Sequence, residues 1–80
     1  MTGKRITNED GHIPRPGEYY KLPDGTWHAM TPNGHLANLA AHTVVEHDDG
    51  TITASPSIRV YSGTVEFWHG YLERGVWRTC

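Results

Sequence analysis

The chain has 80 residues and a formal net charge of −2 at pH 7. Chains divide into several domains only well beyond this length, so we expect one small domain whose core depends on eight aromatic residues. The single cysteine excludes an internal disulfide and Cys-x-x-Cys zinc or iron–sulfur sites. The slight negative charge argues against broad electrostatic binding of nucleic acid.

The apolar runs are far shorter than the roughly 20 residues needed to span a bilayer. No apolar stretch follows Lys4 and Arg5 near the N-terminus, so the sequence shows no signal peptide. We therefore expect a cytoplasmic protein that does not contact a membrane.

Residues 1–17 are polar and end in a segment with two prolines and a glycine, which disfavour helix. We expect an extended or flexible N-terminal arm over 1–17 and a single small β domain over 18–80. The arm is either disordered or packs along the domain through Ile6 and Ile13.

Residues 18–30 predict a β-hairpin. Strands over 18–22 and 27–30 flank Pro23-Asp24-Gly25-Thr26, in which proline presets one φ and glycine supplies a positive one. A similar turn follows at 31–34. Residues 35–41 have helical apolar spacing but are too short for an independent helix, so we expect a short helical turn or an irregular strand.

The second half of the chain predicts more hairpins. We expect strands over 42–47, 51–55, 58–61, 64–72 and 76–78, with a break at Pro56. Alternation in 64–72 places Val65, Phe67, His69 and Tyr71 on one face and Trp68 and Leu72 on the other. The predicted fold is mainly β: a small antiparallel curled sheet or partly open barrel built from hairpins, with at most one short helical turn near 35–41.

The order of motifs carries a family resemblance. Thr-x-Thr-x-Ser-Pro-Ser-Ile over 51–58 is followed by Trp68-His69-Gly70-Tyr71-Leu72, a glycine turn and Val76-Trp77. This order resembles a family of small uncharacterised phage and bacterial β proteins with a Ser-Pro-Ser-Ile strand and a C-terminal His/aromatic hairpin. The resemblance covers about residues 27–78 and implies a β fold and a phage or actinobacterial setting, without an established activity. Many members have a Cys/His metal site, and Thr31 stands where its cysteine is expected, so the resemblance implies that the site is lost here.

The chain contains six histidines, and imidazole is the commonest metal ligand. A structural zinc site needs four ligands, and no histidine pair here has convincing local spacing. We therefore expect no cofactor, with His69 packed among its aromatic neighbours. The alternative hypothesis is a zinc-binding module whose candidate ligands are His35, His42, His47 and His69.

Nucleophilic catalysis needs a hydroxyl or thiol beside a base. Ser55, Ser57 and His69 meet if Pro56 bends one strand toward another, but no Gly-x-Ser-x-Gly elbow accompanies them. We therefore expect no enzymatic activity.

The aromatic residues carry the functional prediction. A thin sheet cannot bury both faces of the 64–72 strand, so one face is expected to be exposed. Tryptophan, tyrosine and arginine are enriched at interaction hot spots. We predict a non-enzymatic protein-interaction module that binds a protein partner, a host protein in a phage setting, or itself as a homodimer. The predicted partner surface consists of Trp68, Tyr71, Arg74, Trp77 and Arg78. Single-stranded nucleic-acid binding is a third hypothesis, because aromatic side chains beside arginine stack bases.

Overall fold

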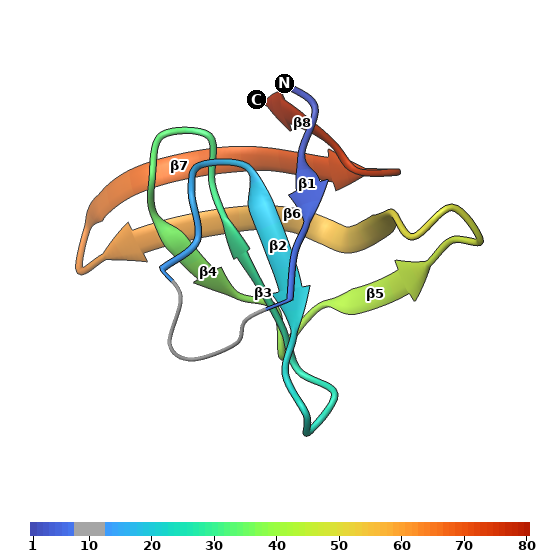
Figure 1. The fold of residues 1–80 in the computed structure, drawn as a ribbon. Helices are drawn as coiled ribbons and strands as arrows, with labels where there is room; N and C mark the ends of the chain where they lie inside the picture. The colour runs from blue at the N-terminus through green and yellow to red at the C-terminus, as the bar shows by residue number, and fades with distance from the viewer. Residues whose placement is uncertain (8–12) are drawn as a thin grey trace.

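In a computed structural model, which describes residues 1–7 and 13–80, the chain forms two four-stranded β-sheets (Figure 1). The described residues contain no helix, which confirms the prediction of a mainly β fold, and the sheets do not close into a barrel. The strands are β1 (Lys4–Arg5), β2 (Glu18–Lys21), β3 (Trp27–Met30), β4 (Leu36–Asn38), β5 (Thr43–Glu46), β6 (Ile52–Ser62), β7 (Val65–Glu73) and β8 (Val76–Thr79). Residues 8–12 of the predicted arm lie outside the described part of the chain.

The first sheet has the order β1-β2-β3-β4, with β1 parallel to β2 and the other pairs antiparallel. The predicted turn between β2 and β3 is present, because the Thr26 N–H donates to Asp24 Oδ1 at 2.9 Å and Gly25 has a φ of 92°. Residues 35–41, for which the sequence allowed a short helical turn or an irregular strand, contain the strand β4 and no helical turn. Pairing with β3 buries Ala37 and leaves Leu36 and Asn38 exposed, which is the period of a strand.

The second sheet is an antiparallel meander in the order β5-β6-β7-β8. The predicted break at Pro56 is wrong, because β6 runs through it without interruption from Ile52 to Ser62. The register between β6 and β7 shifts between Ala54 and Ile58. Proline is tolerated at such an irregularity, since its missing N–H then leaves no regular ladder bond unmade.

The core lies between the two sheets. Its members come from both: Tyr19, Trp27, Ala29, Ala37, Leu39, Ile52, Ala54, Ile58, Trp68, Leu72 and Trp77. The Trp68 and Trp77 rings meet edge to face, with centroids 5.3 Å apart and planes at 81°. Along β7, Trp68 is buried in this core, whereas Phe67 and Tyr71 are exposed.

The N-terminal segment joins the two sheets. Gly3 N–H donates to Gly75 O at 2.7 Å, in the turn between β7 and β8, and Lys4 N–H donates to Gly17 O at 3.2 Å, next to β2. The Trp77 indole N–H also donates to Gly17 O, at 3.0 Å. A β carbon on Gly3 would lie 2.7 Å from Gly17 O and 2.8 Å from Trp77 Nε1, so only glycine fits this junction. We call these contacts among Gly3, Gly17, Gly75 and Trp77 the inter-sheet seam.

Replacing Trp77 by phenylalanine removes the indole donor of the seam and part of the buried ring. We expect Trp77→Phe to lower the free energy of unfolding by about 1–3 kcal/mol, measured by urea denaturation. Tyr61→Phe is the control, because the Tyr61 side chain is 62% exposed and should change stability by less than about 0.5 kcal/mol. Equal effects of the two substitutions would contradict this role of the seam.

Candidate functional site

The fold buries two of the five residues of the predicted partner surface and leaves the other three exposed. Trp68 and Trp77 are only 6% and 2% exposed, so the expectation that these indoles face a partner is corrected. Both tryptophans lie on the inner face of their sheet, where the core of an 80-residue chain needs its largest side chains. The exposed members of the predicted set are Tyr71, Arg74 and Arg78.

Tyr71 and Arg78 are opposite each other on β7 and β8. The Arg78 guanidinium carbon lies 5.9 Å from the centre of the Tyr71 ring, within the range of a cation–π contact. Arg78 also forms an ion pair with Glu73, which fixes the guanidinium from a second side. Arg74 belongs to the β7–β8 turn, where it and Gly75 have φ values of 44° and 75° and its N–H donates to Thr53 Oγ1 at 3.0 Å.

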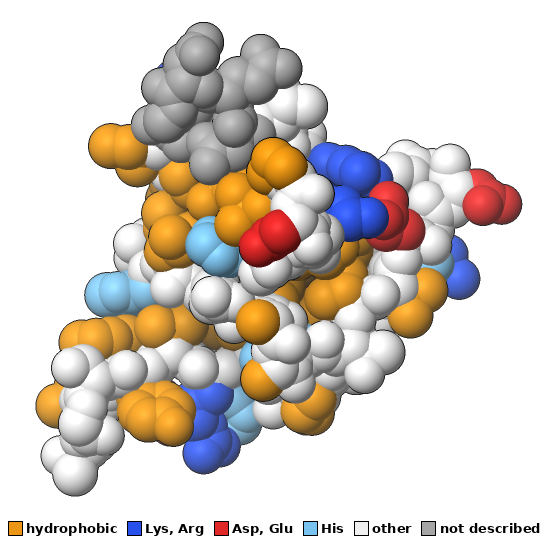
Figure 2. Space-filling model, turned by 90° about the horizontal axis from the view of Figure 1, so that it is seen from below, with side chains coloured by type: hydrophobic (Ala, Val, Ile, Leu, Met, Phe, Trp, Pro, Cys, Tyr) orange, Lys and Arg blue, Asp and Glu red, His pale blue; other side chains and the backbone are white. Residues whose placement is uncertain are grey.

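Exposed hydrophobic side chains gather on the β5–β8 sheet. Six of the nine large exposed hydrophobic residues of the described chain belong to its strands. They are Val45, Tyr61, Val65, Phe67, Tyr71 and Val76. Several hydrophobic side chains stand beside arginine or lysine on the left of Figure 2, on the side where the β6–β7 hairpin ends. We call the solvent-facing side of this sheet the outer face.

Phe67 is an exposed aromatic residue of β7 that the site prediction missed. Alternation had placed it beside Tyr71, but the register between β6 and β7 shifts between Val60 and Tyr61, and Phe67 turns toward the first sheet instead. The His35 ring stacks on it, with centroids 4.5 Å apart and planes at 9°. Asn33 Nδ2 donates to Phe67 O at 2.8 Å, so the β3–β4 turn supports this part of β7. Phe67 is nevertheless 40% exposed.

Each of the four candidate zinc ligands contacts a group other than a histidine, and His42 and His69 share Ser57. His35 stacks on Phe67, and His47 Nε2 lies 2.7 Å from Thr53 Oγ1. His42 Nε2 lies 3.2 Å from Ser57 O, and His69 Nε2 lies 3.0 Å from Ser57 Oγ. Within residues 1–7 and 13–80, no three His, Cys, Asp or Glu side chains are grouped so as to hold a metal ion.

Ser57 and His69 meet as the sequence suggested, because the irregular part of β6 lies opposite the middle of β7. His69 Nδ1 lies 3.7 Å from Glu66 Oε1, and Cys80 Sγ lies 3.9 Å from His69 Nε2. The His69 side chain is 25% exposed on the outer face, so it is partly solvated rather than packed in the core. The absence of enzymatic activity stays a prediction.

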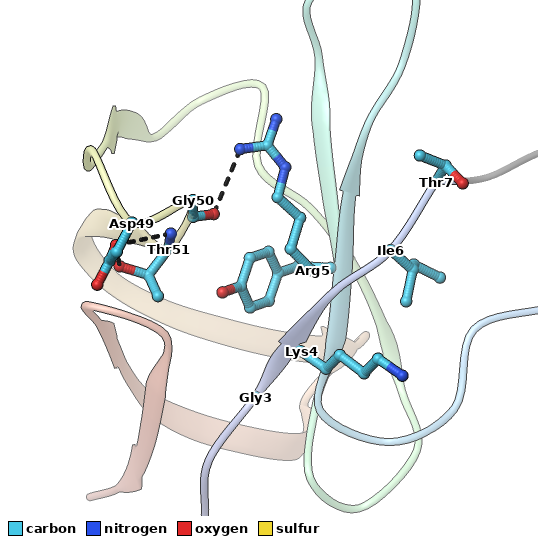
Figure 3. A pocket seen from close by; sticks show the side chains of 9 residues that line it. Gly3, Lys4, Arg5, Ile6, Thr7, Asp49, Gly50 and Thr51 are labelled. Carbon is cyan, nitrogen blue, oxygen red and sulfur yellow. Dashed lines mark hydrogen bonds between the residues drawn. The ribbon is translucent and has the colours of Figure 1, made fainter.

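A cleft of about 870 Å³ lies between β1 and the turn that joins β5 to β6 (Figure 3). Its walls are the segment from Gly3 to Thr7 and the turn Asp49-Gly50-Thr51, and Tyr19 also lines it. Burial raises the pKa of the Tyr19 hydroxyl. Sequence patterns did not predict this cleft, because it is formed by backbone segments more than 40 residues apart.

Arg5 and Glu46 connect the two sheets next to the cleft. Arg5 Nη1 donates to Glu46 Oε2 at 3.2 Å and to Gly50 O at 3.3 Å, and its guanidinium carbon lies 4.9 Å from the Trp27 ring centre. Lys21 Nζ donates to Glu46 Oε1 at 3.0 Å. The hydrogen bond from Lys21, followed by the charges of Lys21 and Arg5, lowers the pKa of Glu46 below its usual 4.5.

A comparison with protein-family models, with curated proteins and with solved structures finds no match for this chain. The resemblance to a phage and bacterial family therefore stays a prediction. No helix in the described ranges has the length and apolar character needed to cross a membrane.

The lowered pKa of Glu46 sets the sign of a pH effect. A carboxylate whose pKa is lowered in the folded state stabilises the fold at pH values above its unfolded-state pKa. This contribution is lost as the pH falls through the folded-state pKa. We expect the unfolding free energy to fall as the pH drops below about 4.5, and Glu46→Gln to reduce that dependence. Urea denaturation between pH 7 and pH 3 measures both, and Glu66→Gln is the matched control. An unchanged pH profile in Glu46→Gln would contradict the assignment.

Proposed function

We propose that the protein is a small interaction module that self-associates through the outer face of the β5–β8 sheet. The supporting observation is that four of the nine large exposed hydrophobic residues lie on this one face of the sheet, namely Val45, Tyr61, Tyr71 and Val76. The solvent-facing side of an antiparallel sheet is ordinarily polar, and contiguous apolar area on a surface favours association. Tyr71 provides an anchor, because its ring contacts the Arg78 guanidinium, which is itself ion-paired with Glu73. Binding then requires little further ordering of these side chains.

The charges on the outer face favour a second copy of the chain as the partner. Arg59 lies 3.8 Å from Glu66, and Arg78 pairs with Glu73, so both signs are present in equal number within these pairs. A surface with both signs is complementary to itself across a two-fold axis, where each arginine can face a glutamate of the other copy. Single-stranded nucleic acid would instead require a surplus of cations.

The available area fits this arrangement. The chain exposes 5024 Å². A standard interface takes about 800 Å² from each partner, which is about a sixth of that surface. Association in this way buries the aromatic side chains that the small core leaves exposed.

Sedimentation equilibrium of the full chain tests the proposal. We expect a concentration-dependent dimer, and Tyr71→Ala should weaken it at least about tenfold because it removes the aromatic anchor. Leu36→Ala is the matched control, since Leu36 is 47% exposed on the other sheet.

Two outcomes would overturn self-association. One is a wild-type chain that stays monomeric up to about 1 mM, a concentration that already detects weak dimers. The other is equal weakening by Tyr71→Ala and Leu36→Ala. Binding of a different protein by the monomer, lost in Tyr71→Ala, would assign the outer face to a foreign partner instead.

A further inference from the structure

A cysteine and a histidine lie side by side on the outer face. Cys80 N–H donates to His69 O at 3.0 Å, which places Cys80 beside His69 just beyond the end of β8. Cys80 Sγ lies 3.9 Å from His69 Nε2. The cysteine is exposed and the His69 side chain is 25% exposed, so both groups are within reach of a dissolved metal ion.

The distance between these two atoms suits a single zinc ion. Tetrahedral zinc has a Zn–S bond of about 2.3 Å and a Zn–N bond of about 2.0–2.1 Å, which puts the sulfur and the nitrogen about 3.6 Å apart. The 3.9 Å between Cys80 Sγ and His69 Nε2 is close to that value. A small rotation of the exposed Cys80 side chain supplies the difference.

The surroundings of His69 orient its ring for metal binding. Glu66 Oε1 lies 3.7 Å from His69 Nδ1. A carboxylate near this nitrogen favours the proton on Nδ1 and leaves the Nε2 lone pair free to accept. The Ser57 hydroxyl, with Oγ at 3.0 Å from Nε2, is placed to donate to that lone pair. A metal ion on Nε2 would take the place of this hydroxyl, which is free to turn toward solvent.

One copy of the chain provides too few ligands for a structural zinc site. Such a site has four. Within residues 1–7 and 13–80, no three His, Cys, Asp or Glu side chains are grouped around a common point, so Cys80 and His69 form half of a site. A two-fold axis through the outer face brings the same two residues of a second copy to the same place, because such an axis repeats every surface group.

We propose that two copies of the chain bind one zinc ion between their outer faces, through Cys80 and His69 of each copy. The inference rests on the proposed self-association and names the ion that strengthens it. The half-site adjoins the aromatic anchor, because His69 and Tyr71 are two residues apart on β7 and share a face.

The completed site carries no net charge, which favours its burial in an interface. Each Cys80 thiol gives up its proton to solvent when the sulfur binds the ion, and each His69 ring stays neutral. Two thiolates therefore balance the two positive charges of the zinc ion. Thiolate and imidazole ligands also select zinc over magnesium, which prefers oxygen ligands.

Sedimentation equilibrium of the full chain tests the proposal, with the protein kept reduced so that Cys80 stays a thiol. We expect half an equivalent of zinc chloride to lower the dissociation constant of the dimer at least about tenfold relative to the chelator-treated protein. Magnesium chloride at the same concentration should leave the constant within about twofold. Native mass spectrometry should give one zinc ion per two chains.

Substitutions of the two ligands test the assignment. The readout is the ratio of the dimer dissociation constants with chelator and with zinc, measured within each variant. Cys80→Ser and His69→Gln should each reduce this ratio to about one, because either change leaves only two ligands for the ion. His28→Gln is the matched control, since His28 lies on β3 in the other sheet and should keep the ratio within about twofold of the wild-type value.

Three results would overturn the zinc bridge and leave self-association standing. They are a dimer whose dissociation constant does not respond to zinc, one zinc ion bound per chain, and a full zinc response in Cys80→Ser or His69→Gln. A chain that stays monomeric up to about 1 mM with the chelator and with zinc would overturn both proposals. Dimerisation that occurs only with zinc would support the bridge and make the ion obligatory for self-association.

Discussion

The hydrogen bond from the Trp77 indole N–H to Gly17 O is the contact on which the arrangement of the two sheets depends. It is buried, spans 60 residues of sequence and joins the last strand of one sheet to the start of β2 in the other. Gly3 runs directly beside this hydrogen bond, and a β carbon on it would lie 2.7 Å from Gly17 O and 2.8 Å from Trp77 Nε1. A buried hydrogen bond in such a place stabilises modestly when made and costs more when one partner is left unpaired.

The seam also determines what lies on the surface. Because Trp77 and Trp68 turn inward to pack edge to face, Arg78, the neighbour of Trp77, and Tyr71, opposite Arg78, turn outward. The same junction places the N-terminal segment between the sheets, so that the backbone of Arg5 faces the β5–β6 turn. The outer face and the cleft are therefore two consequences of one packing arrangement.

The sequence predicted the elements better than the surfaces. Turn chemistry at Asp24-Gly25 and Asp49-Gly50 located two hairpins, because the side-chain acceptors and positive φ values that such turns need are local. The choice between a helical turn and a strand at β4, and the continuity of β6 through Pro56, were not predictable from the sequence, since β3 and β7 supply the pairing that decides them. Tertiary pairing overrode local preference at both places.

The same limit applies to the candidate sites. Alternation along β7 correctly separated Trp68 from Phe67 and Tyr71, but both faces carry aromatic rings. Which face is buried depends on Trp77 and the first sheet, so the sequence placed two core indoles on the surface. The cleft left no signal in side-chain patterns, because it forms between chain segments more than 40 residues apart.

Self-association through the outer face is tested most directly by amide spectra of the ¹⁵N-labelled chain during dilution from about 1 mM to about 10 μM. The account predicts shifts concentrated on the outer face, at residues such as Val45, Tyr71 and Arg78. The amides of β4, including Leu36 and Ala37, should stay unchanged. Spectra that do not depend on concentration, or shifts centred on the β1–β4 sheet, would contradict it.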